Sequence, residues 1–334
     1  MSAPEISIVL VNYKTPQLLL QCLKSLFAYT KGCLFEVIVV DNGSEDNSEE
    51  IIAAEFAGKI QWINMGYNAG FARGNNKGVA AAKAPYVLLL NSDVLLDEDA
   101  VTSALHEFKT QQTQGNTGIL CCKIVSFEGK VLPGVHSRFP SIRDLLRSNA
   151  LIIFLLRGKV SQHVHPQQWY NTSHEAAHIS GAFMLFNRAQ IESTTGLLDE
   201  DFFLYLEDVE WCYRLNRAGL SCYYFATTKV MHKDSGSSVN SDWKELQIFI
   251  SRLLFFYKSY GAFYLKCYVA MYRFNAMLDD FFYRRKGHGY TAAETRAAQW
   301  RTASLKAINK YVPLILDNYK RTPHSAKSFL KYEY

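Results

Sequence analysis

Short apolar runs and segments with helical spacing follow one another through the first 120 residues. The apolar runs predict strands at Ile6–Val11, Phe35–Val40, Ile60–Asn64 and Tyr86–Leu90. Helical spacing predicts helices at Thr15–Tyr29 and Glu49–Phe56, and the glycine- and asparagine-rich stretch Gly66–Gly78 predicts a loop. Nearly continuous apolar strands separated by helices indicate a mainly parallel sheet that is covered on both faces. The predicted fold class is therefore α/β.

Beyond residue 120 the pattern is less regular. It predicts a strand at Gly181–Phe186 and a helix at Val209–Ala218. The apolar pattern at Leu145–Leu156 predicts a helix, which is far shorter than the ~20 residues that a helix needs to cross a bilayer. Two interpretations of that helix fit equally well: a helix of the protein core, or a helix that dips into a membrane surface.

The composition narrows the class of protein. Of the 334 residues, 49% are hydrophobic and 14% aromatic, which excludes a disordered chain, and 20% are charged, which excludes a polytopic membrane protein. The seven cysteines show no C-x-x-C spacing, and the N-terminal residues show no signal-peptide pattern. We therefore expect reduced thiols and a cytoplasmic location.

The net charge of +5 is unevenly distributed. Residues 1–245 hold 21 basic and 26 acidic residues, a net charge of −5, whereas residues 246–334 hold 15 and 5, a net charge of +10. Residues 246–283 are also dense in aromatic side chains that basic residues interrupt, with Gly261 as a point where a helix could break. This predicts a domain at 1–245 and a basic, aromatic-rich helical C-terminal region at 246–334.

A basic helix with many aromatics is typical of proteins that bind membrane surfaces. The same pattern fits a helical subdomain packed on the rest of the protein, or a homodimer interface. Nucleic acid is a poorer partner, because the body that would face it is acidic. We expect peripheral attachment to a membrane surface through residues 246–334.

Polar residues follow three of the predicted strands. They are Asn12 and Tyr13, then Asp41, Asn42, Gly43 and Ser44, and then Asn91, Ser92 and Asp93. Such residues are common in turns, but in open α/β sheets the ligand lies at the carboxyl ends of the strands. Three polar strand ends in succession favour a ligand site. The chain has no G-x-G-x-x-G or Walker motif, so neither a dinucleotide fold nor a P-loop is supported.

A second group of candidate residues lies further along the chain. Glu207 and Asp208 stand where a helix is expected to begin, and His232 follows an apolar pair. Each could be structural: the two acids as helix-capping residues and His232 as a core histidine, while Glu210 and Arg214 fit a surface ion pair. Taken together, Asp93 and His232 could bind Mg²⁺ or Mn²⁺ and leave positions open for a diphosphate. Asp208 could then act as a carboxylate base.

Five sequence blocks resemble the family-2 glycosyltransferases of the GT-A fold, in matching order and spacing over about residues 5–240. The blocks are Ile6–Tyr13, Val39–Ser44, Asn68–Gly78, Leu90–Asp93 and Tyr205–Trp211. The sequence is most similar to the rhamnosyltransferase-like branch, which also shows Arg138-Phe139-Pro140 and the element His232…Gly236-Ser237.

The resemblance implies a GT-A fold with a mixed, mainly parallel sheet, a donor-binding half at 1–120, an acceptor-binding half at 121–245 and a C-terminal helical extension. It implies donor-binding roles for Asn12, Tyr13, Asp41, Asn42, Gly43, Asn68, Gly70, Asn75 (or Asn76), Asn91, Ser92 and Asp93. Asn91-Ser92-Asp93 stands at the family's D-x-D position, so the metal would be held mainly by Asp93 and His232. Asp208 matches the catalytic base, with Glu207 beside it.

The activity that the resemblance implies is inverting transfer of a sugar from a nucleoside-diphosphate donor to a lipid-linked glycan in bacterial surface polysaccharide synthesis. L-rhamnose from dTDP-rhamnose is the expected donor sugar, at the inner face of the plasma membrane. Two alternatives stay open. One is the same chemistry with a UDP-hexose, UDP-N-acetylhexosamine or galactofuranose donor, and the other is a non-catalytic sugar-nucleotide-binding subunit.

Overall fold

The computed structural model describes residues 3–147, 167–233, 241–285 and 291–321. By proximity of Cα atoms the chain divides into two compact units. The first unit comprises residues 1–139 and 165–239, and the second comprises residues 140–164 and 240–334. Residues 140–147, which the expected acceptor half included, therefore belong with the C-terminal helices.

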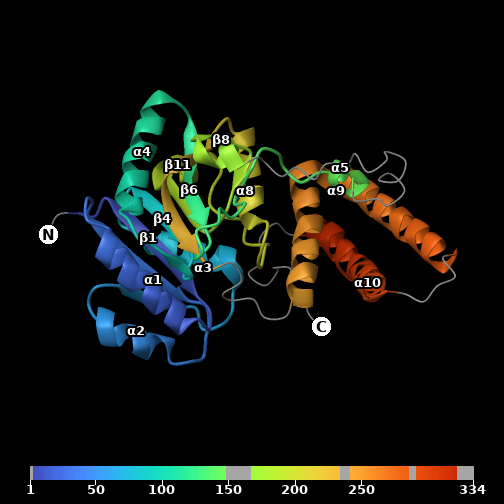
Figure 1. Ribbon diagram of the computed structural model, residues 1–334, viewed down its shortest axis with the longest axis horizontal. Coiled ribbons are helices and arrows are strands. Elements are labelled where there is room, and N and C mark those ends of the chain that lie inside the picture. Colours follow the sequence, from blue (N-terminus) through green and yellow to red (C-terminus); the bar gives the residue numbers. More distant parts are fainter. Residues whose placement is uncertain (1–2, 148–166, 234–240, 286–290, 322–334) are drawn as a thin grey trace. The chain divides into compact units, whose positions relative to one another are not determined.

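The first unit is built on a nine-stranded sheet with the order β3-β2-β1-β4-β10-β6-β11-β5, to which β8 adds by pairing with β11 (Figure 1). Its strands are β1 Ile6–Asn12, β2 Phe35–Asp41, β3 Gln61–Asn64, β4 Tyr86–Leu90, β5 Val94–Leu95, β6 Thr117–Val125, β8 His174–Ala176, β10 Phe183–Asn187 and β11 Ser221–His232. A separate two-stranded sheet pairs β7 Val135–His136 with β9 His178–Ile179. The helical elements are α1 Pro16–Tyr29, α2 Ser48–Phe56, α3 Gly70–Ala81, α4 Ala100–Gln114, α7 Arg188–Thr194, α8 Glu207–Arg217 and the 3₁₀ turn η1 Gln167–Asn171.

Strands β1 to β4 run parallel to one another, as the apolar pattern predicts. In their register Asn12 pairs with Asp41, and Asp41 with Asn64, so the polar strand ends meet at one edge. The antiparallel strand β10 lies between β4 and β6, which makes the sheet mixed. The predicted α/β class and the GT-A arrangement are confirmed.

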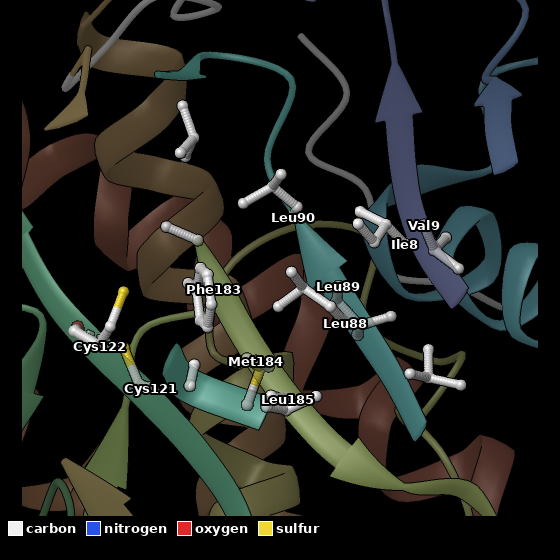
Figure 2. Close-up of a cluster of buried hydrophobic side chains, with 14 of the residues drawn as sticks. Ile8, Val9, Leu88, Leu89, Leu90, Cys121, Cys122, Phe183, Met184 and Leu185 are labelled. Carbon is white, nitrogen blue, oxygen red and sulfur yellow. Dashed lines mark hydrogen bonds between the residues drawn. The ribbon is translucent and has the colours of Figure 1, made fainter. Parts of the chain in front are cut away.

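The middle of this sheet is the core of the first unit. Figure 2 shows the apolar side chains of β1, β4, β6 and β10 packed together, among them Ile8, Leu89, Cys121 and Phe183. All four are essentially inaccessible to solvent. Strands from the expected donor-binding half and from the expected acceptor-binding half share this core. Its close packing therefore holds the polar strand ends in fixed positions.

The expected loop at Gly66–Gly78 is wrong for most of its length, because α3 begins at Gly70. Glycine lowers helix propensity, but here two glycines allow close packing. A Cβ on Gly78 would lie 2.3 Å from Cγ1 of Val9, and one on Gly74 would lie 3.0 Å from Cγ1 of Val11. The glycines therefore let α3 lie directly on β1, and this tertiary packing outweighs propensity.

Other predicted elements hold with shifted ends. The strand expected from Gly181 begins at Phe183, and the helix expected from Val209 begins at Glu207. Of the helix predicted at Leu145–Leu156, the structure describes residues 145–147 as the end of α5 Ile142–Arg147, and the remainder lies outside the described residues.

The second unit is helical, as expected for the C-terminal region. Besides α5 it contains α9 Ser241–Arg285 and α10 Ala292–Arg321. Gly261 has φ 88° and ψ 172°, so α9 consists of two helices that meet there (Figure 1). Tyr272 and Ser304 join α9 to α10 through their hydroxyl groups at 2.7 Å. In the described parts of the chain, no helix is both long enough and apolar enough to cross a membrane.

Candidate active site

Asn12, Asp41 and Ser44 form a closed hydrogen-bond network where β1 and β2 end. Nδ2 of Asn12 donates to Oδ1 of Asp41 (2.8 Å) and to Oγ of Ser44 (3.1 Å). The Ser44 hydroxyl and backbone N–H donate to Oδ1 and Oδ2 of Asp41, at 2.6 and 3.0 Å. All three residues are buried. The neighbouring Tyr13 is 36% exposed beside this network.

Asn42 connects this network to the start of α3. Its Nδ2 donates to Oδ1 of Asn68 and to the carbonyl of Gly70, both at 3.1 Å, and its Oδ1 accepts from Ala69 N–H at 2.9 Å. Gly43 has φ +70°, and a Cβ there would lie 2.5 Å from the carbonyl carbon of Tyr67. The expected donor residues Asn42, Gly43, Asn68 and Gly70 thus fix the loop that precedes α3.

Asn75 and Asn76, also expected to contact the donor, have partners within the protein. Asn75 is buried, and its Nδ2 donates to the carbonyl of Phe71 at 2.9 Å. Nδ2 of Asn76 donates to the carbonyl of Leu198 at 2.9 Å. These bonds give both residues a framework role, and their contact with a donor stays a prediction.

Asn91, Ser92 and Asp93 follow β4, and β11 brings His232 beside them. His232 pairs with Val94 across the β11–β5 ladder, which sets its Nε2 3.0 Å from Oδ1 of Asp93 and 3.5 Å from Nδ2 of Asn91. The hydroxyl of Ser92 lies 3.4 Å from that of Thr15. Residues 139 positions apart therefore meet at the same edge of the sheet as Asp41.

Asp93 and His232 fit a divalent cation as a pair of protein ligands. A carboxylate oxygen and an imidazole nitrogen lie side by side, and each side chain keeps some solvent exposure, 11% for Asp93 and 17% for His232. Within the described residues no cluster of three or more metal-ligating side chains occurs. Mg²⁺ commonly takes one or two protein carboxylates, with water and substrate phosphates completing the shell. Asp93 and His232 are the residues that could hold a cation shared with a diphosphate.

A strained turn precedes Glu207 and Asp208. Tyr205 and Leu206 have φ of 68° and 63°, a left-handed conformation that is uncommon for bulky residues. Lys14 and Glu45, just after β1 and β2, complete the set of described non-glycine residues with positive φ. Backbone strain of this kind is often found at functional sites, and here all of it borders the polar edge and the start of α8.

Asp208 is partly buried at the start of α8 and is held by backbone donors. Its Oδ2 accepts from Gly181 N–H and its Oδ1 from its neighbour Val209 N–H, both at 2.8 Å. Burial raises the pKa of the Asp208 carboxyl above its usual range, and these amides oppose the rise. A partly buried carboxyl with a raised pKa, whose ionised form is stabilised by two backbone amides, is suited to accept a proton.

Glu207 is buried beside it and has less support, since its own backbone N–H is the only backbone group that favours its charged form. Of the side-chain atoms described, its Oε2 is one of the few that are buried without a hydrogen-bond partner. Burial, and then the adjacent Asp208 charge, raise the pKa of Glu207 well above its usual range. The amide donors favour ionisation of Asp208, so Glu207 is the member of the pair that keeps its proton.

A short segment connects Asp208 to the Asp93–His232 pair. The backbone N–H of Asn91 donates to the carbonyl of Ala182 at 3.1 Å, and the preceding residue, Gly181, is the one that donates to Asp208. A second tie comes from α3. The N–H of Phe71 donates to the carbonyl of Phe203 at 2.8 Å, and Nε of Arg73 to the carbonyl of Glu200 at 3.2 Å. The expected base and the expected metal ligands are therefore connected by a short hydrogen-bonded segment, and their action in one site stays a prediction.

The Glu210–Arg214 pair is present, with Nε and Oε1 2.8 Å apart, but its expected surface location is wrong because Glu210 is buried. Arg214 also donates to the carbonyls of Thr195 and Leu197, so it holds the segment that leads to α8.

Phe139, from the Arg138–Pro140 element, packs near this site. Its ring lies 5.8 Å from His178 and 5.2 Å from Tyr213 between centroids. His178 stacks on His136 at 4.4 Å. Burial, with His136 next to it, lowers the pKa of His178 to about 3, so His178 is neutral at physiological pH.

Sequence reasoning missed Thr15, Arg73 and the Tyr205–Leu206 turn. Thr15 bonds to Oδ1 of Asn12 at 3.2 Å as well as approaching Ser92, and thereby joins two strand ends. Its position directly after a polar strand end was an available signal. Nothing in a Tyr-Leu dipeptide signals a left-handed turn.

The profile of glycosyl transferase family 2 matches residues 7–193. This match covers more than half of the chain, and with the GT-A fold and the polar sheet edge it defines the class. The protein belongs to glycosyl transferase family 2.

Three relatives show how similar the sequence of this chain is to individual proteins. The low-salt glycan biosynthesis hexosyltransferase Agl10 of Haloferax volcanii is 28% identical over 221 residues, which cover 65% of this chain and 63% of that protein. The rhamnosyltransferase WbbL of Escherichia coli is 25% identical over 206 residues, covering 59% of this chain and 72% of WbbL. An N-acetylglucosaminyl-diphospho-decaprenol L-rhamnosyltransferase of Mycobacterium tuberculosis is 24% identical over 262 residues, covering 73% of this chain and 83% of that one. The chain thus spans less than two thirds of Agl10.

Among solved structures, residues 1–349 of Staphylococcus aureus TarS in complex with UDP-GlcNAc align with a TM-score of 0.51. The identity is 15%, and the alignment covers 93% of this chain and 83% of that one. At this identity the likeness concerns the fold, and it agrees with the GT-A arrangement.

Proposed function

We propose that this protein is an inverting glycosyltransferase that moves a sugar from a nucleoside-diphosphate donor to an acceptor hydroxyl. The observation that supports this most directly is the connection of two kinds of chemistry at one sheet edge. A cation-binding pair, Asp93 and His232, adjoins Asn91, and Asn91 is bonded to the segment whose Gly181 holds Asp208. A diphosphate site next to a partly buried carboxylate base is what a single displacement at a sugar carbon requires.

In the proposed step, Asp208 takes the proton of the acceptor hydroxyl while its oxygen attacks the anomeric carbon. The bond from that carbon to the diphosphate oxygen breaks, and the nucleoside diphosphate leaves with the bonding electrons. One displacement inverts the anomeric centre. A divalent cation held by Asp93 and His232 would neutralise charge on the diphosphate. Asn12, Tyr13, Asp41 and the loop fixed by Asn42 would form the nucleotide-binding floor.

We propose L-rhamnose from dTDP-rhamnose as the donor sugar, because two of the relatives carry rhamnosyltransferase in their names. The acceptor would be a lipid-linked glycan of a bacterial surface polysaccharide, since the mycobacterial relative is named for a decaprenol-linked acceptor. The protein would then work at the inner face of the plasma membrane, with residues 1–245 as the catalytic part and the basic C-terminal region toward the lipid.

A UDP-sugar donor is the second candidate, because the fold aligns with TarS in complex with UDP-GlcNAc and because Agl10 is named a hexosyltransferase. A thermal-shift panel with and without Mn²⁺ separates the two, since a ligand stabilises the folded state in proportion to its occupancy. We expect a rise in Tm with dTDP-rhamnose that increases with Mn²⁺. A rise in Tm with UDP-sugars alone would show that the donor is a UDP-sugar and not dTDP-rhamnose. No rise with any sugar nucleotide would contradict it.

Hydrolysis of the donor without acceptor separates an enzyme from a sugar-nucleotide-binding subunit. We expect slow, Mn²⁺-dependent release of nucleoside diphosphate by the wild-type protein. Binding without any turnover, with or without an acceptor, would favour the binding subunit.

A further inference from the structure

The part of α9 after Gly261 carries an exposed apolar stripe. Phe263 is 81% exposed, Phe274 55%, Met277 60% and Phe281 47%. At about 100° per residue these four side chains fall within an arc of about 60° along some five turns of helix. We call them the α9 stripe. Large apolar side chains that gather on one helix face and stay in water usually mark an interaction surface.

The opposite face of the same helix is already occupied. Leu265, Tyr268 and Ala276 are buried, and Tyr272 bonds to Ser304 of α10. Asp279 and Asp280 pair with Arg301 of α10 at 3.5 and 2.9 Å. The helix therefore has a structural face within its own unit, on the side opposite to the α9 stripe.

Charge indicates what the stripe contacts. Lys266 is exposed on the same helix segment, whereas Arg273, also exposed, donates from its guanidinium to Oδ1 of Asn309 in α10 at 2.8 Å. Residues 246–334 hold 15 basic and 5 acidic residues. The stripe is thus presented by a strongly cationic region. A second copy of the chain would bring two such regions together, which like-charge repulsion opposes. An anionic lipid surface offers both an apolar layer for the rings and opposite charge for the basic residues.

We propose that the α9 stripe inserts into the interfacial layer of an anionic lipid membrane, with Lys266 against the headgroups. The helix lies in the plane of the surface, because its other face is covered by α10. This deepens the membrane-surface part of the proposed function by naming the side chains that carry it.

The test is co-sedimentation of the full-length protein with phosphatidylglycerol–phosphatidylcholine vesicles. Phe263→Ser should lower the partition coefficient about tenfold, which corresponds to about 1.4 kcal/mol, because the ring no longer contributes buried apolar surface. Phe263→Trp should retain binding. Phe127→Ser is the matched control, because Phe127 is also exposed, at 42%, but belongs to the first unit; it should bind like the wild type.

The charge component is tested separately. Lys266→Glu, or a rise in salt from 0.05 to 0.5 M, should weaken binding to anionic vesicles and leave the smaller binding to pure phosphatidylcholine unchanged. Equal loss in Phe263→Ser and Phe127→Ser, or unchanged vesicle binding by a Phe263→Ser/Phe274→Ser/Phe281→Ser variant, would overturn the proposal. If that triple variant instead converts a dimer to a monomer by light scattering and still binds vesicles, the stripe is a dimer surface.

The Tm rise with sugar nucleotide is measured on the same variants. We expect it to be unchanged, because the stripe belongs to the second unit and the donor residues to the first. A failure of vesicle binding with intact donor binding overturns the membrane inference alone, and the reverse result overturns the proposed donor function alone.

Discussion

Asp41 and Glu207 are both buried carboxyl groups near one edge of the sheet, yet their surroundings differ sharply. Asp41 accepts three hydrogen bonds, from Asn12 and Ser44. Glu207 has an oxygen that is buried without a partner, and the turn before it is strained. A buried polar atom without a partner costs about 1–3 kcal/mol. The hydrogen bonds at the strand ends thus fix the Asp41 carboxylate in one position. At the start of α8 the Glu207 carboxyl is not fixed in this way, and its protonation can change.

The largest effect that would sharpen this comparison is expected from Asp208→Asn. The amide keeps the size of the side chain but cannot take the acceptor proton, so kcat should fall by about 10² or more while donor affinity is retained. Steady-state kinetics together with a calorimetric Kd for the donor measure both quantities. Near-normal kcat with intact donor binding would remove Asp208 from the role of base.

The contact between the start of α3 and the segment that precedes α8 is tested by Gly70→Ala. Gly70 has φ +83°, and a Cβ there would lie 2.2 Å from the carbonyl oxygen of Phe203. We expect a loss of about 2 kcal/mol in the free energy of unfolding, from strain and from displacement of the segment before α8. Gly66→Ala is the matched control, because Gly66 has φ +73° with no atom within 4 Å. Equal losses in urea denaturation would show that backbone strain alone is at work.

Asp41→Asn should affect binding rather than turnover. The substitution replaces an acceptor oxygen by a donor in a network where Asn12 and Ser44 already donate. We expect the donor KM to rise about tenfold and kcat to be spared. Asp46→Asn, in the same turn but exposed and bonded only within the start of α2, should change neither. A fall in kcat without a rise in KM would place Asp41 in the chemical step instead.

A different kind of effect, in the pH dependence of stability, is expected from Glu207→Gln. The pKa of Glu207 is raised in the folded state, so between its usual range and the raised pKa the folded chain keeps a proton that the unfolded chain has lost. Wild-type stability should therefore fall with increasing pH across that window, by about 1 kcal/mol per pH unit. Urea denaturation between pH 5 and 8 should show a shallower slope for Glu207→Gln. Parallel slopes would mean that Glu207 titrates normally.

The same contrast explains what could be predicted from the sequence. Parallel strands with polar ends were predictable, because apolar runs report burial and adjacent strand ends meet by topology. The helix at Gly70–Ala81 was not predictable, because glycines in a sequence usually indicate the end of a helix. Only the structure shows that they allow close packing against Val9 and Val11. The turn at Tyr205–Leu206 was also unpredictable, since its conformation is imposed by the packing around it. The candidate residues were found individually, whereas the bonds that join them, such as Asn91 to Ala182, required the structure.

The packing of α3 has a consequence for synthesis of the chain. One side of this helix rests on β1 through Gly74 and Gly78, and another binds the segment at 198–203, with Arg73 and Glu200 separated by 127 positions. A nascent chain that has emerged only as far as β4 contains the expected nucleotide floor but lacks the partner of α3. Contacts of such long range form late and slow folding. A nascent chain that ends before residue 200 would therefore leave the hydrogen-bonding groups of Phe71, Arg73 and Asn76 without these partners until the rest of the sheet is made.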